Sequence, residues 1–416
     1  MEVYVLDSLF RRSQVVDRFE SCIWTERWAD IGEFELHLQS TQGNRRLFKP
    51  GTRLAINDSK RVMTVETAES ASDSDGKRML NVKGRSLEAI LDERVAVGVN
   101  TRSDAPDPLF MAEWPFMDYP EWIARYMFID VMNGQQSSGD VISQLHWDPK
   151  SYPTVTPATP GSDNLFPEDT IPETNFQIDW VQKPASLYKA IKDLADIYDF
   201  GFRFYRNGDT GQLFFNIYTG SDRTLQQETL SPIVFSSDLQ NLMDTTEFNT
   251  IEKTKNVAFV MWVNPTGTVY TELVYAPEID PTTATGLDRH TIYVAGEVQE
   301  DDQADPALIS AALQRQGLDE LAKHRAFTGF DGEISQYTQY KYDQDYFLGD
   351  LVVMQDVDGF RNNMRVTEQI FVSDNEGDRS YPTLSFRNFI QPGSWEDFGY
   401  RAWEDMGLTE YWADQP

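Results

Sequence analysis

Asp345 to Val372, DYFLGDLVVMQDVDGFRNNMRVTEQIFV, is the stretch of sequence that decides the fold. The part from Phe347 to Met354 is mostly apolar and rich in residues that favour strands. Asp356 to Gly359 has the composition of a tight turn, and the alternation of apolar and polar residues resumes from Met364 to Val372, with Glu368 as the exception. This pattern predicts a β-hairpin.

A similar pattern occurs near the other end of the chain. Phe48-Lys49-Pro50-Gly51 leads into Leu54-Ala55-Ile56, Asn57-Asp58 can turn the chain, and Met63-Thr64-Val65 follows, to be compared with Met364-Arg365-Val366. Both copies hold a phenylalanine, a glycine, a short apolar strand, an acidic turn and then Met-x-Val. The repeat predicts two copies of a small β-domain, and chance similarity between two short hairpins is the alternative.

The composition is that of a folded, acidic protein. The 416 residues are enough for about two to four domains, and 40% hydrophobic residues are typical of folded chains. Cys22 is the one cysteine, so no internal disulfide can form. No run approaches the ~18 apolar residues of a membrane span, and the N-terminus lacks a signal-peptide pattern. We therefore expect a soluble protein made in the cytoplasm.

The net charge of −31 repels nucleic acid phosphate, which argues against a nucleic-acid-binding protein. Either the charge serves solubility, or it forms a surface along which DNA passes without binding.

Several helices are predicted from apolar spacing and capping residues. The clearest lies within residues 181–200: Pro184 is expected to start it and Gly201 to stop it. Its apolar stripe is formed by Leu187, Ile191, Leu194, Ala195 and Tyr198. Ser86 is expected to cap a short helix, and Pro120 to start another. Asp305 is expected to cap a helix that runs to about His324.

The order of these elements predicts a mainly β protein with additional α+β parts. The proline-rich part, with 10 of the 20 prolines, is expected to be an irregular insertion. The expected divisions are a first β-domain over 1–96 that is completed by about 230–250, the insertion over 97–180, a small α+β domain over 181–229, a second β-domain over 251–392 with an inserted helix near 305–324, and an acidic aromatic tail over 393–416.

The tail contains a short repeat. Trp395-Glu396-Asp397-Phe398-Gly399 recurs as Trp403-Glu404-Asp405-Met406-Gly407, within a segment that holds six acidic and six aromatic residues. Either these aromatic residues pack on the chain's own body, or the segment docks on another protein.

The sequence predicts no catalytic, cofactor-binding or metal-binding residues. It lacks the HExxH, GxSxG, GxGxxG and P-loop motifs. Two acidic turns, Asp73-Ser74-Asp75-Gly76 and Asp356-Val357-Asp358-Gly359, fit the middle of a calcium loop, but Val82 and Arg365 stand where the closing glutamate belongs. Plain hairpin turns are the better interpretation.

Cysteine and histidine chemistry receives no support either. Cys22 lies on a predicted strand, and we interpret it as a buried structural residue. The four histidines are scattered and none has metal-ligand spacing: His37, His146, His290 and His324. With 67 acidic residues, a pair of carboxylates of the kind used in glycoside hydrolysis stays possible. Nothing in the sequence singles out two of them.

The chain resembles the siphovirus ReqiPepy-type tail protein family, minor tail proteins from long-tailed phages of actinobacteria. The similar stretches run in the same order over residues 17–368: Asp17-Arg-Phe-Glu-Ser, Ile23-Trp-Thr-Glu-Arg, Gly32-Glu-Phe-Glu-Leu, Val82-Lys-Gly-Arg-Ser-Leu, Leu194-Ala-Asp-Ile-Tyr, Asn256-Val-Ala, Gly286-Leu-Asp-Arg, Asp345-Tyr-Phe-Leu-Gly-Asp-Leu-Val and Met364-Arg-Val-Thr-Glu. Residues 97–180 and the tail have no counterpart.

The resemblance implies a non-enzymatic baseplate or tail-tip hub in the virion. Such hubs are homotrimers in which each chain carries two related small β-barrel domains, similar to those of the tail tube, together with α+β peripheral domains. The implied partners are a distal tail protein or tail-tube ring, the tape-measure protein and other minor tail or tip proteins. Genome DNA would only pass through the channel, and we hypothesise that part of the negative charge lines it.

Two other functions are kept as alternatives. One is a tail-associated cell-wall hydrolase, although only about 24 residues follow the last β-domain. The other is a carbohydrate-binding receptor module that uses the aromatic residues of 110–150.

Overall fold

The hairpin predicted from Asp345 to Val372 is present in the computed structural model, as strands β23 (Leu351–Gln355) and β24 (Arg361–Asp374). They pair antiparallel, with Val352 opposite Met364. The structure describes residues 1–16, 18–72, 77–100, 109–132, 142, 145–147, 177–208, 210–250, 254–277, 279–282, 284–298, 305–324, 327–334, 340–355 and 361–386. The acidic turns at 73–76 and 356–359 and the tail at 393–416 lie outside them. The described residues form two compact units: the first combines 1–250 with 327–387, and the second holds the intervening residues.

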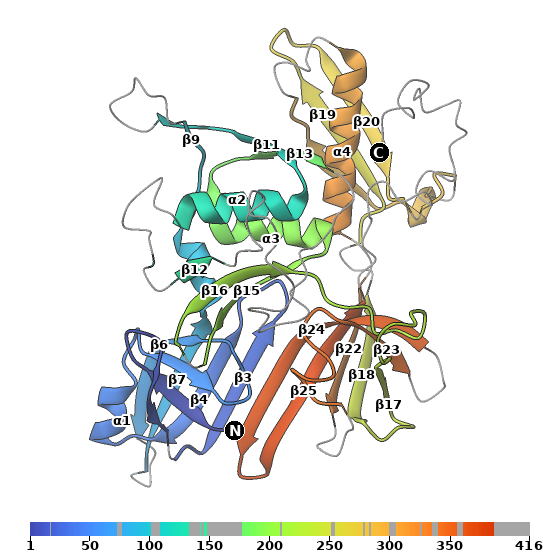
Figure 1. The fold of residues 1–416 in the computed structure, drawn as a ribbon. Coiled ribbons are helices and arrows are strands. Elements are labelled where there is room, and N and C mark those ends of the chain that lie inside the picture. Colours follow the sequence, from blue (N-terminus) through green and yellow to red (C-terminus); the bar gives the residue numbers. More distant parts are fainter. Residues whose placement is uncertain are drawn as a thin grey trace. The chain divides into compact units, whose positions relative to one another are not determined.

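Strands near the N-terminus form the first antiparallel sheet of unit 1, in the order β3-β4-β7-β6-β5, and β1 and β2 continue it beyond β5 (Figure 1). A short helix, α1 (Gln42–Leu47), joins β4 to β5. Alternate side chains along the strands, such as Trp24, Leu36 and Val82, are buried in one core. The strand bounds are β1 Val3–Leu6, β2 Arg12–Val15, β3 Ser21–Arg27, β4 Glu33–Gln39, β5 Arg53–Ile56, β6 Met63–Ser72 and β7 Arg78–Ser86.

Five later strands form a second sheet with the same plan. Their order is β18-β22-β25-β24-β23, so each strand has a counterpart at the same place in the first sheet. A short strand, β17 (Val234–Ser236), continues this sheet by pairing parallel to β23. The remaining bounds are β18 Leu242–Thr250, β22 Phe327–Ile334 and β25 Gly377–Phe386.

The two hairpins noticed in the sequence match in register and in hydrogen bonding. Leu54 lies opposite Met63 in the first, as Val352 lies opposite Met364 in the second. The N–H of Gly51 donates to the carbonyl of Val65 at 2.8 Å. In the same way, the N–H of Gly349 donates to the carbonyl of Val366, also at 2.8 Å. The repeat in the sequence is therefore a repeat of structure.

Further details of the repeat also agree. A β-bulge follows Val65 in one copy and Val366 in the other. The structure changes one assignment, however. In each copy a tight turn precedes the first strand of the hairpin. The carbonyl of Lys49 accepts from the N–H of Thr52 in the first copy, and the carbonyl of Phe347 accepts from the N–H of Asp350 in the second, so Lys49 corresponds to Phe347. The counterpart of Phe48 is therefore Tyr346, and not the phenylalanine that the sequence comparison aligned with it; both side chains are buried.

The two sheets join into one, because β24 pairs antiparallel with β3 and places Phe371 opposite Trp24. The result is a single sheet of 13 strands. Along the described strands its path runs from β18 to β2 and does not close on itself. The structure is thus mainly β as expected, while the two closed barrels stay a prediction.

An α+β layer completes unit 1. Helix α2 (Pro120–Met132) begins at the predicted proline, and its apolar residues share a core with α3 (Leu187–Tyr198) and the hairpin of β15 (Gly201–Arg206) and β16 (Leu213–Tyr218). The predicted stripe of α3 is buried. Small strands lie around this layer: β8 Val95–Ala96, β9 Val99–Asn100, β10 Leu109–Phe110, β11 Trp114–Asp118, β12 Leu145–Trp147, β13 Ile178–Gln182 and β14 Ala185–Ser186.

Two helix predictions are corrected. Helix α3 begins at Leu187 and not at Pro184, because Ala185 and Ser186 pair with β8 and the Ser186 hydroxyl accepts from the N–H of Lys189 at 3.2 Å. It ends before Asp199, which has a positive φ of 56°, and Gly201 already begins β15. The helix after Ser86 is the 3₁₀-helix η1 (Leu87–Glu93). Ser86 does not cap it, since its hydroxyl accepts from the N–H of Gly32 instead.

Unit 2 is a three-stranded sheet with one helix. Its strands β19 (Val257–Val263), β20 (Val269–Tyr275) and β21 (Thr291–Ala295) lie in the order β20-β19-β21, and a 3₁₀-helix, η4 (Gly286–Asp288), precedes β21. Helix α4 (Pro306–Lys323) covers one face (Figure 1). Asp305 caps α4 as predicted, accepting from the N–H of Ala307 at 2.8 Å.

In the second sheet, unit 2 is inserted between β18 and β22. The corresponding strands of the first sheet, β3 and β4, are joined by a short connection. Among the described residues, no helix has the length and apolar character needed to cross a membrane.

Candidate functional site at the seam of the two sheets

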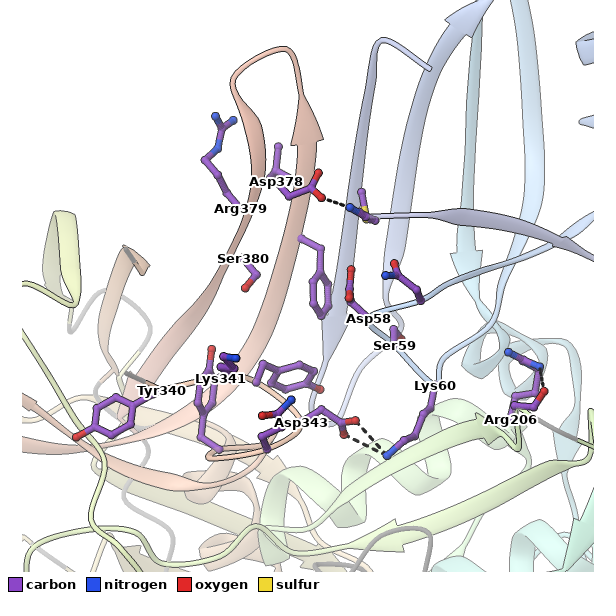
Figure 2. A pocket seen from close by; sticks show the side chains of 18 of the residues that line it. Asp58, Ser59, Lys60, Arg206, Tyr340, Lys341, Asp343, Asp378, Arg379 and Ser380 are labelled. Atoms are coloured by element: carbon purple, nitrogen blue, oxygen red, sulfur yellow. Dashed lines mark hydrogen bonds and ion pairs between the residues drawn. The ribbon is translucent and has the colours of Figure 1, made fainter. Parts of the chain in front are cut away.

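A cleft of about 570 Å³ lies in unit 1 beside the seam where β24 pairs with β3. Segments from distant parts of the chain line it: Met1, Arg12 on β2, the connection from β5 to β6 at 57–60, the end of β15 with the residues after it at 206–208, the segment 340–346, and parts of β24 and β25 between 371 and 380. Figure 2 shows Lys60, Asp343 and Asp378 at its wall. Only the tertiary structure brings these segments together.

Cations outnumber carboxylates in this cleft, although the whole chain is acidic. The amino terminus and the side chains of Arg12, Lys60, Arg206, Lys341 and Arg379 line it together with Asp58, Asp343 and Asp378. Lys60 lies 3.1 Å from Asp343, and the amino terminus pairs with Asp378 (Figure 2). Aromatic side chains of Tyr340, Tyr342, Tyr346 and Phe371 complete the lining. Arg379 is paired as well, with Asp374 at 2.6 Å and Glu376 at 2.8 Å, so the cleft combines aromatic surface with a small excess of positive charge.

A buried charged network lies next to the cleft. Arg61 donates to Glu88, and its Nε lies 4.0 Å from a carboxylate oxygen of Glu26. Glu26 also accepts from the hydroxyl of Tyr342 at 3.1 Å. Burial raises the pKa of Glu26, and the nearby Arg61 charge only partly offsets this effect. Glu88 accepts from the backbone N–H of Phe204 at 2.8 Å, so the network ties the first sheet to the α+β layer and to the segment at 340–346.

A second buried pair holds the organising hairpin in place. Asp350, immediately before β23, is fully buried and accepts from the Nε of Arg223 at 2.7 Å. It also accepts from the backbone N–H groups of Ser221 at 2.8 Å and Phe347 at 3.0 Å. Burial raises the pKa of Asp350, and these donors act in the opposite direction. Both networks thus fix strands and loops with every carboxylate engaged by protein donors.

The residues weighed for chemistry in the sequence do not come together. Cys22 is buried, and burial raises the pKa of its thiol to about 12, so it remains protonated at neutral pH. His37 lies 3.0 Å from Glu35, and His324 lies 3.4 Å from Glu320. Within the described ranges, no three potential ligands among His, Cys, Asp and Glu lie together in a way that could hold a metal ion. The side chain of His146 is outside the described set.

The sequence alone did not point to the cleft. Its lining comes from segments separated by more than a hundred residues, and no local motif marks them. The described lining contains neither histidine nor cysteine.

Comparison with known proteins is consistent with this architecture. Residues 2–381 match the family described as Siphovirus ReqiPepy6 Gp37-like protein. The tail protein from Neisseria meningitidis MC58 has 14% sequence identity and a TM-score of 0.53, over 94% of this chain and 98% of that chain. The 43 kDa tail protein of prophage MuSo2 from Shewanella oneidensis has 12% identity and a TM-score of 0.47, over 92% and 96% of the two chains. No curated protein matches the sequence. The first of these likenesses shows a shared fold.

Proposed function

Because the chain belongs to the Siphovirus ReqiPepy6 Gp37-like protein family, we propose that it is a structural protein of a phage tail. In finer terms, it is a homotrimeric hub at the tip of a non-contractile tail. There it continues or closes the tail tube and connects the tube to the tip and receptor-binding proteins. Its place is the virion, and its role is structural and not catalytic.

The observation that supports a hub is the tandem repeat within unit 1. The two sheets share strand order, hairpin register and bulge position. Three copies of a chain with two such sheets present six similar positions, which is what a three-fold part needs in order to meet a six-fold ring. The proposed neighbours are a distal tail protein or tail-tube ring, the tape-measure protein and other minor tail proteins. The closed, tube-like barrels expected over 1–96 and 251–392 belong to this proposal, with the difference that residues 251–326 of the second range form the separate unit 2, and β18 (Leu242–Thr250) belongs to the second sheet.

The distribution of charge refines the idea of a channel that repels DNA. The outward face of the first sheet carries matched ion pairs: Arg27 with Glu33 at 2.7 Å, Lys83 with Glu35 at 2.8 Å, and Arg85 with Glu66 at 2.8 Å. This face therefore contributes little of the net charge of −31, and a DNA-repelling lumen has to draw on other acidic residues.

The test is the mass of the purified chain by light scattering, together with immunolabelling of virions. A mass near three times 47.8 kDa and label at the tail tip are expected. Label elsewhere on the particle, or no label at all, would overturn the tail-tip assignment. A chain that stays monomeric at every concentration and also in the isolated tail would overturn the trimer. Release of soluble fragments from purified cell wall, absent in a buffer control, would replace the structural role with hydrolysis.

A further inference from the structure

Arg206, at the end of β15, is a buried cation of the cleft that has no carboxylate partner. The residue is only 3% exposed. Its Nη1 donates to the carbonyls of Phe10 and Gly208, each at 3.3 Å, while its Nε is buried without a hydrogen-bond partner. Among the residues that the structure describes, no carboxylate forms an ion pair with it. Because a buried charge is normally paired, this arginine is free to interact with an anion from outside the chain.

A second cation acts on the same place. Arg12 on β2 lines the cleft together with Arg206, and its guanidinium lies over the ring of Tyr4, 4.1 Å from the ring centroid. Burial lowers the pKa of Arg206, and repulsion from the charge of Arg12 lowers it further. The two guanidinium groups are therefore close enough to repel each other, and a bound anion that interacts with both would remove this repulsion.

The carboxylates of the cleft are engaged elsewhere. Asp343 pairs with Lys60, and Asp378 pairs with the amino terminus. Burial raises the pKa of Asp58, the amino terminus lowers it, and Asp378 raises it further, so Asp58 belongs to the same group of charges as Asp378. Figure 2 shows Asp58 and Asp378 together and Arg206 apart from them. The end of the cleft at Arg206 is therefore the end with uncompensated positive charge.

The protein holds Arg206 in place from two sides. Its backbone N–H donates to the carbonyl of Lys60 at 2.9 Å, and its side chain is bonded to the carbonyl of Phe10. The connection from β5 to β6 and the turn before β2 thus fix the guanidinium before any ligand arrives, which lowers the entropic cost of binding. The cleft, at about 570 Å³, has the size of a small-molecule site.

The charge of the ligand follows from that of the site. A phosphate monoester carries a charge of about −1.5 to −2 at pH 7, which balances two guanidinium groups. A carboxylate, or a phosphodiester of nucleic acid, carries a single charge and would leave one arginine uncompensated. The planar fork of arginine also matches the oxygens of a phosphate group.

We propose that Arg206 and Arg12 form a binding site for a dianionic phosphate group. The group is either inorganic phosphate or the terminal phosphate of an organic ester, whose apolar part would contact the tyrosines of the cleft. The site lies within one chain, so this proposal goes beyond the structural role in the tail and does not depend on it.

The experiment is isothermal titration calorimetry of the full chain at about pH 7.5, where the phosphate group is mostly dianionic. Inorganic phosphate, dimethyl phosphate and acetate are compared at equal ionic strength. We expect saturable binding of phosphate at one site per chain, about tenfold tighter than that of either monoanion. Arg206→Gln and Arg12→Gln should each weaken phosphate binding by about tenfold.

The matched control is Arg379→Gln, which removes a cation of the same cleft that is already paired with Asp374 and Glu376. It should leave the affinity for phosphate unchanged. Arg12→Gln keeps the test decisive if Arg206→Gln misfolds, because Arg12 is exposed on β2, at one end of the sheet. Circular dichroism verifies the folding of each variant.

Three results would overturn the proposal. The first is the absence of saturable phosphate binding. The second is an equal loss in the Arg12 and Arg379 variants, which would indicate general attraction to a positive surface. The third is binding of acetate or dimethyl phosphate as tight as that of phosphate. If the site is confirmed, titration with phenyl phosphate identifies the source of the group: tighter binding than inorganic phosphate indicates an organic ester, and equal or weaker binding indicates phosphate itself.

Discussion

Trp28 packs against the backbone of Gly349, and a Cβ atom built on Gly349 would overlap the indole ring. Trp28 follows β3 of the first sheet, while Gly349 precedes β23 of the second. The same ring meets Tyr218 of the α+β layer edge to face, at 4.7 Å between centroids. One side chain therefore joins both sheets and the layer, and the glycine is required by close approach as well as by its φ of +92°.

Gly349→Ala should therefore destabilise unit 1 strongly. Overlap with the ring and the positive φ together are expected to cost about 2–4 kcal/mol of unfolding free energy. The matched control is Gly51→Ala, at the equivalent position of the first hairpin, where φ is +89° and no atom lies within 4 Å of the added Cβ. It should cost only about 1–2 kcal/mol. Urea denaturation measures both, and an equal loss in the two variants would contradict the role of Trp28.

Removal of the Glu88 carboxylate tests the buried network. Glu88→Ala leaves the buried Arg61 guanidinium without its closest partner and the N–H of Phe204 without an acceptor. A loss of about 3–5 kcal/mol is expected. Glu66→Ala removes an exposed ion pair with Arg85 and should cost under about 1 kcal/mol. Chemical denaturation followed by tryptophan fluorescence compares them, and a small effect of Glu88→Ala would show that the network is dispensable.

The insertion of unit 2 should be removable. Thr250 and Phe327 are paired residues at the ends of β18 and β22, so the chain leaves and re-enters the sheet at neighbouring positions. Replacing residues 251–326 with an Asn-Gly turn should leave a hairpin that closes on its own. Circular dichroism and the mass in solution should then be those of a folded unit 1. An insoluble or unfolded product would show that unit 1 depends on the insertion.

Asp319 on α4 should make the stability of unit 2 depend on pH. Burial raises the pKa of its carboxyl to about 6 from an ordinary value near 3.8. Because the folded state holds this proton more tightly, the contribution of Asp319 to stability is greatest below about pH 4 and is lost as the pH rises through about 6. Asp319→Asn removes this loss and should stabilise the unit at pH 7 by about 1–2 kcal/mol, since partial solvent exposure reduces the effect. At pH 4 the variant and the parent should be alike.

Hydrogen exchange of the α4 amides at the two pH values measures this prediction. Equal protection of the variant and the parent at pH 7 would show that the carboxylate is well solvated in the folded state.

Local sequence patterns determined most of the elements of this protein. Alternation and turn residues predicted the β23–β24 hairpin and its counterpart of β5 and β6, and the Asp305 cap predicted the start of α4. These signals are reliable because they act over a few residues, through side-chain direction and backbone hydrogen bonding. The membership of the family was visible for the same reason, since it depends on short stretches in a fixed order.

Only the tertiary structure decided how the elements combine. The pairing of Phe371 with Trp24 merges two sheets from opposite ends of the chain. The start of α3 moved to Leu187 because Ala185 and Ser186 pair with β8, a distant strand that local propensity does not register. The cleft likewise assembles Lys60 with Asp343 from separate segments. In each case the arrangement is stabilised by contacts between residues far apart in sequence. Patterns among neighbouring residues carry no information about such contacts.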